Sequence, residues 1–120
     1  MALSPKELLN QLMQTEGAMC AALVDYNSGM LLESVGSGLD LELAAAGNTE
    51  VVRAKMKTMK SLNLNDDIED ILISLHRQYH IIRPLEKHDG LFLYYVLDRS
   101  RSNLAMARRK LLEAESQVTL

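Results

Sequence analysis

The sequence offers few residues that could carry out chemistry, and its single cysteine is the first candidate. Cys20 together with a histidine could supply a nucleophile and a base. Cys20 lies in the apolar run 19–24, however, where a buried and unreactive thiol is expected. His76 and His80 flank an expected turn, so the spacing of metal ligands on a helix does not apply to them. We predict that both histidines lie at the surface.

Two further patterns resemble catalytic or cofactor sites only superficially. Gly36-Ser37-Gly38 lacks the length and the lysine of a phosphate-binding loop, and it is predicted to be a flexible connection. The paired acids Asp66 and Asp67 fall in a polar stretch without a hydrophobic pocket to raise a carboxyl pKa. We therefore predict no catalytic residue, no cofactor and no metal, and hence a protein that is not an enzyme.

Five cationic residues gather around the start and middle of the last expected helix: Arg99, Arg101, Arg108, Arg109 and Lys110. They could contact nucleic acid, but the net charge of the chain is −3 and aromatic residues make up only 4% of it. Those rings fall mostly within expected strands rather than on a stacking platform. We interpret the cluster as a solvated face and predict no nucleic-acid partner.

The composition predicts one globular domain over residues 1–120. Apolar residues make up 48% of the chain and charged residues 24%. One cysteine cannot form an internal disulfide, which fits a reducing cytoplasm. The sequence has neither a signal-peptide pattern nor an apolar run near the roughly 18 residues of a membrane span. We expect a cytoplasmic location and no membrane insertion.

Capping patterns predict three helices. Ser4, Pro5 and Glu7 form a capping box with proline at the first helical position, and Gly17 is expected to end this helix. A second helix over 41–62 is capped by Asp40. A third helix follows a cap at residue 102 or 103 and carries apolar residues at 104, 107, 111 and 114.

Apolar runs between these helices predict five strands, at 19–24, 30–35, 68–75, 79–85 and 91–97. Asn27, Ser28 and Gly29 predict a hairpin turn between the first two strands. Pro84 cannot donate to a strand ladder, so it is expected at a bulge or a strand end. The last strand is the most apolar and should lie at the centre of the sheet.

The resulting fold class is α+β, with the order α-β-β-α-β-β-β-α. Strands that are apolar on both sides need cover on both faces of one largely antiparallel sheet. The first and third helices can cover one face, which leaves the second helix alone on the other. One helix is too narrow for a five-stranded face, so the pattern predicts a second molecule there.

In this order, the turn at 25–29, the long helix and the segments "HIIRPL" and "GLFLYYVLDRSRSNLAMARRKL" resemble the roadblock/dynein light-chain family. The resemblance spans residues 3–115 and is closest to prokaryotic stand-alone members. It implies a roadblock fold, of the longin-like and profilin-like type. The family pairs its third strand, at a sheet edge, across a two-fold axis, with the second helices packed together.

The resemblance therefore implies a homodimer. Gly47 supports it, because a residue without a side chain at the middle of a long helix lets two helices approach closely, although glycine costs about 1 kcal/mol there. Acidic residues in the first half of the helix and basic residues in the second can pair across an antiparallel crossing or simply complement the helix dipole. The predicted dimer interface comprises Leu43, Gly47, Asn48, Val51, Ala54, Ile68, Asp70, Ile71, Leu72, Ile73, Ser74 and Leu75.

The function implied by the resemblance is that of a regulator or scaffold of a Ras-like small GTPase. By analogy, the partner surface would include Lys55, Met56, Met59 and Lys60, and the two methionines fit a core stripe equally well. One alternative is an adaptor of the dynein light-chain kind that does not affect GTP turnover. Another is a small-molecule sensor of the PAS kind, which would need a large internal cavity, whereas the bulky aliphatic strands here predict a filled core.

Overall fold

The computed structural model describes residues 2–118 of the chain. Within this range the helices and strands follow the order α-β-β-α-β-β-β-α, which confirms the order predicted from the sequence. Their bounds are α1 Pro5–Leu12, β1 Ala18–Asp25, β2 Met30–Gly36, α2 Leu41–Ser61, β3 Ile71–Ser74, β4 Gln78–Pro84, β5 Leu91–Asp98 and α3 Leu104–Gln117.

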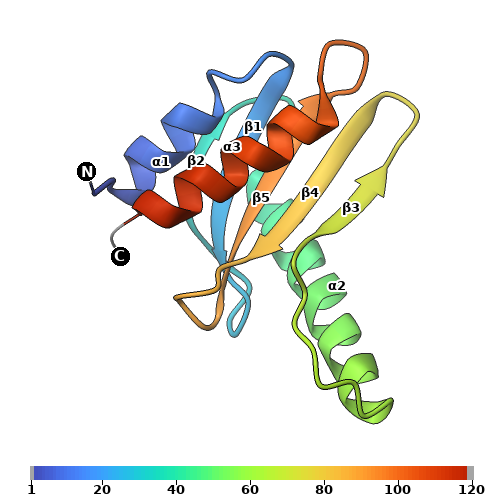
Figure 1. The fold of residues 1–120 in the computed structure, drawn as a ribbon. Helices are drawn as coiled ribbons and strands as arrows, with labels where there is room; N and C mark the ends of the chain where they lie inside the picture. Colours follow the sequence, from blue (N-terminus) through green and yellow to red (C-terminus); the bar gives the residue numbers. More distant parts are fainter. Residues whose placement is uncertain (1, 119–120) are drawn as a thin grey trace.

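The strands form one antiparallel sheet in the order β2-β1-β5-β4-β3 (Figure 1). The near-continuous apolar strand β5 lies at the centre, as its composition predicts, because both of its faces are buried. β2 and β3 are the two edges. β3 pairs with β4 on one side, and within residues 2–118 no strand pairs with its other side.

The predicted third strand over 68–75 is too long, since β3 covers only Ile71–Ser74. The ladder between β3 and β4 begins at Ile71 opposite Ile82. One step further, the partner strand reaches Arg83 and then Pro84, which has no N–H to offer and which ends β4. Residues 64–70 are therefore extended but unpaired in the ladder. Pro84 thus occupies a strand end, one of the two positions predicted for it.

The first helix is also shorter than predicted, because α1 ends at Leu12 rather than near Gly17. The tight bonds Gln14 N to Gln11 O (3.1 Å) and Thr15 N to Leu12 O (3.3 Å) close the helix early. Gly17 then turns the chain into β1 with φ of +87°, and a Cβ on it would lie 2.0 Å from Ser102 Oγ. The glycine is needed for this turn and for the close approach of the loop before α3.

Helices cover both faces of the sheet, which confirms the predicted layering (Figure 1). α1 and α3 lie together on one face, where they enclose a core that contains Leu8, Leu23, Ile81, Tyr95 and Leu111. α2 lies on the other face over a second core, which contains Cys20, Ala45, Val52, Phe92 and Val96. The sheet thus separates two hydrophobic cores, one under two helices and one under a single helix.

The N-terminal half of α2 packs on the sheet, and its C-terminal half extends past the sheet edge (Figure 1). Asp40 caps the helix by accepting a hydrogen bond from Leu43 N. The buried residues of α2 are Ala45, Thr49 and Val52, all in its first two-thirds. Among residues 2–118, none of the helices combines the length and the apolar character that crossing a lipid bilayer requires.

Truncation of a core leucine on α3 should test this layering. Leu111 is 1% exposed in the α1–α3 core, whereas its neighbour Leu112 is 55% exposed. We expect Leu111→Ala to lower the free energy of unfolding by about 2–5 kcal/mol, through lost burial and a residual cavity. Leu112→Ala should change it by less than about 0.5 kcal/mol. Urea unfolding of both variants measures the difference, and equal losses would contradict the placement of this helix face.

Candidate interaction surface

The residues that the sequence singled out for possible chemistry lie on different elements of the described chain: Cys20 on β1, Gly36 at the end of β2, and Asp66 and Asp67 before β3. Cys20 is fully buried, and burial raises the pKa of its thiol to about 11, so the reactive thiolate is absent near neutral pH. Gly36 has φ of +85° and packs against the backbone of Met19 and Cys20 as a turn at the end of β2. Asp66 and Asp67 lie exposed on the extended segment 64–70. Residues 2–118 contain no group of three or more His, Cys, Asp or Glu side chains placed to hold a metal ion.

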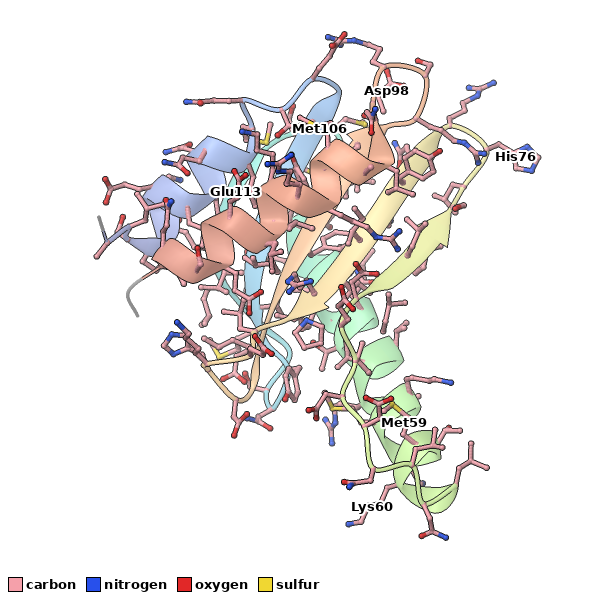
Figure 2. All side chains as sticks on the ribbon, in the orientation of Figure 1. Met59, Lys60, His76, Asp98, Met106 and Glu113 are labelled. Atoms are coloured by element: carbon pink, nitrogen blue, oxygen red, sulfur yellow. The ribbon has the colours of Figure 1, made fainter. Side chains whose placement is uncertain are left out.

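The prediction that both histidines lie at the surface is correct for His76 and wrong for His80. His76 is exposed at the tip of the β3–β4 hairpin (Figure 2). His80 is half-buried on β4, where it packs edge-on against the Tyr94 ring at 5.5 Å. The predicted strand over 79–85 already contained His80, but the sequence pattern did not indicate that its side chain packs against Tyr94 on the α2 side of the sheet.

His80 joins a short chain of polar side chains on the α2 side of the sheet. Its Nε2 lies 2.8 Å from Gln78 Oε1, which can only accept, so Nε2 carries the proton. Its Nδ1 then accepts from the Tyr94 hydroxyl at 2.7 Å. Burial raises the pKa of Tyr94, and the nearby Asn48 side chain, from the middle of α2, acts in the opposite direction.

The cationic cluster near α3 is largely occupied by internal contacts. Arg108 makes a bidentate pair with Asp70, with both N–O distances at 3.0 Å. Arg109 and Lys110 both pair with Glu113, on the exposed side of the helix. Arg99 lies over the Tyr79 ring and donates to Leu75 O at 3.0 Å. These contacts favour a structural role for the cluster.

A stripe of apolar and small residues runs along the outer side of α2. Leu43 is 71% exposed and Val51 is 39% exposed, while Gly47 and Ala54 are exposed between and after them. Spacings of three and four place these residues on one helix face, opposite the buried Ala45, Thr49 and Val52. No atom lies within 4 Å of the position a Cβ on Gly47 would take, so nothing inside the protomer requires glycine there.

The other predicted interface residues lie on the edge strand or next to it in sequence, and Ile68 and Ile71 share a groove with Val51 of the stripe. Ile71 and Ile73 face the α2 side and are half-buried. Leu72 faces the α1–α3 core, and Asp70 points to Arg108 on α3. Ile68 is half-buried before the strand, and Ser74 and Leu75 are exposed at its end. Backbone pairing along this edge would thus engage side chains of both faces.

A groove with a volume of ≈ 490 Å³ separates α2 from the segment 64–70. Val51, Lys55 and Met59 line it from the helix, and Leu64, Ile68 and Ile71 line it from the opposite side. Met59 and Lys60 lie on the projecting end of α2 (Figure 2). Met56 instead packs against the α2-side core and is only partly accessible. Three of the four predicted partner residues therefore lie together on this end of the helix.

Sequence analysis missed a network that fixes the segment before β3. Arg83 and Glu115 form a buried ion pair at 2.6 Å, and Glu115 also accepts from Glu86 N at 2.8 Å. Arg83 also donates to Glu69 O at 3.4 Å. The available signal was an arginine inside an apolar strand and a glutamate four residues after the buried Leu111, on the same helix face. Each charge alone would be costly to bury, and together they hold β4, α3 and the crossover segment.

This architecture is that of Roadblock/LC7 domains, as comparison with solved structures shows. A Roadblock/LC7 domain from Streptomyces avermitilis superposes with a TM-score of 0.80 at 14% identity, covering 97% of this chain and 93% of that one. Myxococcus xanthus MglB gives a TM-score of 0.76 at 17% identity, covering 94% and 86%. MglB in a tetrameric arrangement gives a TM-score of 0.78 at 18% identity, covering 91% and 80%.

No family model matches the sequence, and no curated protein matches it. The fold is nevertheless clear, because these structures superpose with TM-scores of 0.76–0.80 over 91–97% of this chain. The resemblance to the roadblock/dynein light-chain family, drawn from the residues alone, is thus confirmed at the level of the fold.

The hydrogen-bonded side chains of Gln78, His80 and Tyr94 predict that the free energy of unfolding depends on pH. Burial lowers the pKa of His80 below 6.5, so below that value the unfolded state binds more protons than the folded state. The contribution of neutral His80 is fully present above 6.5, and it is lost as pH falls through the lowered pKa. We expect the urea midpoint to fall between about pH 7 and about pH 5, and His80→Gln to flatten this dependence. A variant with an unchanged slope would contradict it, and His76→Gln is the matched control at an exposed position.

Proposed function

We propose that the chain is a non-enzymatic binding module that forms a homodimer through the α2–β3 surface. We define the α2–β3 surface as the stripe Leu43, Gly47, Val51 and Ala54 together with the open edge of β3. The observation that carries the proposal is that the exposed apolar face of α2 and the unpaired edge of β3 border one groove, which Val51 lines from the helix and Ile71 from the strand. Either feature alone favours association, and a two-fold axis would cover both at once.

The sheet geometry supports the same arrangement. α2 lies closest to β2 and β1, so the β3–β4 part of that face receives little helical cover. Ile71, Ile73 and His80 are only half-buried there as a result. A second copy that packs its α2 against the first would place new helix surface beside this region. Gly47 is suited to the crossing point because it adds no side chain between the two backbones.

We further propose that the partner is a Ras-like small GTPase in the cytoplasm and that the projecting end of α2 contacts it. The resemblance to bacterial regulators of such GTPases motivates this choice, and the tetrameric arrangement of MglB supports self-association in proteins of this fold. Lys55 and Met59 line the groove beside α2, and Lys60 is exposed nearby. A cation beside a flexible apolar side chain suits an adaptable protein contact.

A scaffold without effect on turnover is the second candidate. The absence of a catalytic constellation among residues 2–118 is compatible with both roles, because a regulator of this kind would reorganise the partner's own active site. The two roles differ only in the rate of GTP hydrolysis, which the second experiment below measures.

Substitution of Gly47 tests the dimer. In the protomer a leucine at position 47 points into open space and improves helix propensity by about 0.8 kcal/mol over glycine, so the fold should not suffer. At a helix crossing, the same side chain would separate the two backbones. We expect Gly47→Leu to raise the dimer dissociation constant by about 100-fold or more, the loss of roughly 3 kcal/mol of contact. Sedimentation velocity measures the association.

Arg53→Leu is the matched control for that substitution. Position 53 is exposed on the same helix and lies about a third of a turn from the middle of the stripe. This variant should dimerise like the wild-type chain. A Gly47→Leu protein that remains a dimer at micromolar concentration would remove the helix crossing from the proposal.

Measurements of GTP hydrolysis test the proposal that the partner is a Ras-like small GTPase. A Ras-like GTPase encoded beside this chain's gene should hydrolyse GTP at a different rate when the chain is present. We expect Met59→Ala with Lys60→Glu to weaken binding about tenfold or more while the dimer persists, and Lys110→Glu on the opposite face to leave binding unchanged. Isothermal titration and single-turnover hydrolysis are the measurements. Binding with an unaltered rate selects the scaffold, and no binding to any such GTPase contradicts the partner.

A further inference from the structure

The two ends of the edge strand carry opposite charge. The segment before β3 presents Asp66, Asp67 and Glu69, all exposed. The hairpin after β3 presents His76 and Arg77, also exposed. Figure 2 shows His76 at the tip of that hairpin, directed away from the rest of the molecule. We call these sets the acidic flank and the basic flank of β3.

Neither flank forms an ion pair among residues 2–118, although Lys55 lines the same groove as Asp66 and Asp67 from the side of α2. Asp70 is held by Arg108, which leaves the other three acids without an ion pair within 4.0 Å among the described residues. Near the basic flank, Asp98 is satisfied by the Ser100 N–H and hydroxyl, at 3.0 Å and 2.7 Å. Arg99 adds a further positive charge beside Leu75. Both flanks are therefore available to an external partner.

The backbone of β3, between the two flanks, has an unpaired edge that could pair with another strand. The β3–β4 hairpin is closed by Leu75 N bonding to Gln78 O at 2.9 Å, which leaves His76 and Arg77 as its two-residue loop. On the other side, residues 64–70 lie outside the ladder, although Arg83 and Arg108 hold Glu69 and Asp70 in place. The open edge of β3 thus lies between the acidic flank and the basic flank.

A two-fold axis at this edge brings unlike flanks together. If the axis passes through Leu72, residue 69 of one copy faces residue 75 of the other, since 144 − 69 = 75, and residue 75 is the last before the hairpin loop. If it passes through Ile73, residue 71 faces residue 75 instead, since 146 − 71 = 75. In both cases the loop residues His76 and Arg77 of one copy lie beside the segment that precedes β3 in the other. A parallel arrangement would set acid against acid and base against base. The charge pattern therefore discriminates between the two orientations.

We propose that the acidic and basic flanks of β3 determine the specificity of self-association, with two symmetric sets of ion pairs that select an antiparallel second copy of this chain. This inference rests on the proposed homodimer and adds the residues that set its orientation and its choice of partner. Exposed ion pairs contribute little individually, but like charges placed opposite each other disfavour the wrong arrangement.

Two complementary charge-reversal variants test the inference. One variant carries Asp67→Lys and Glu69→Lys, and the other carries His76→Glu and Arg77→Glu. Within a dimer of either variant, like charges meet at both symmetric sites, so each should dissociate about tenfold or more readily than the wild type. When the two variants are mixed, unlike charges meet at both sites, so a heterodimer should form with nearly wild-type affinity. Native mass spectrometry resolves the two homodimers and the heterodimer.

Matched controls reverse two charges on the α1–α3 face. Glu16→Lys with Glu113→Lys matches the first variant, and Arg101→Glu with Arg109→Glu matches the second; neither should change the affinity. Circular dichroism verifies that every variant is folded.

The outcomes distinguish the role of the flanks from the proposed homodimer on which it rests. A wild-type chain that stays monomeric at about 100 μM contradicts the homodimer itself, because that is far above the concentrations at which specific dimers form. A wild-type dimer whose flank variants keep full affinity, or whose mixture associates no better than each variant alone, overturns only the role of the flanks. Heterodimer formation in the mixture, with unaffected controls, supports it.

Discussion

The width of the sheet relative to a single helix is the constraint on which the rest of the structure depends. Five strands about 4.8 Å apart place the outer two roughly 20 Å from each other, whereas a helix with its side chains is about 10–12 Å wide. Two helices, α1 and α3, cover one face of the sheet. The single helix α2 lies over the opposite face. α2 takes a position near β1 and β2, so the edge at β3 keeps half-buried isoleucines and an unpaired backbone. The candidate surface is the direct result of this mismatch.

The polar side chains on the two faces of the sheet are paired in different ways. The closed face buries a complete ion pair, Arg83 with Glu115, and the pair extends its contacts to Glu69 and Glu86. On the half-open face, a series of hydrogen bonds links the side chains of Gln78, His80 and Tyr94. From the closed face, Arg83 and Arg108 hold the segment that leads into β3. The open edge is thus kept in position by the side of the molecule that faces away from α2.

Most of the fold could be predicted because its signals are local. The capping box at Ser4, the cap at Asp40 and the apolar content of β5 each identify an element without knowledge of its neighbours. The predictions that were wrong concern features that a neighbouring element determines. β3 is short because its partner strand ends at Pro84, and His80 is half-buried because its ring packs against Tyr94 on the neighbouring strand β5. The exposed stripe of α2 was predictable from its period, whereas the Arg83–Glu115 pair joins residues too distant in sequence for any periodic pattern to reveal.

The sequence by itself determined which segments are helices and strands, that both faces of the sheet need cover, and that one face receives less of it. Periodicity and capping contain that information because each depends on residues at most a few positions apart. Only the tertiary structure decided that His80 bonds to Tyr94, that nothing crowds Gly47, and that Asp70 is turned toward Arg108. Those facts depend on where separate elements lie in space, because burial and charge pairing arise between segments that the chain brings together only on folding.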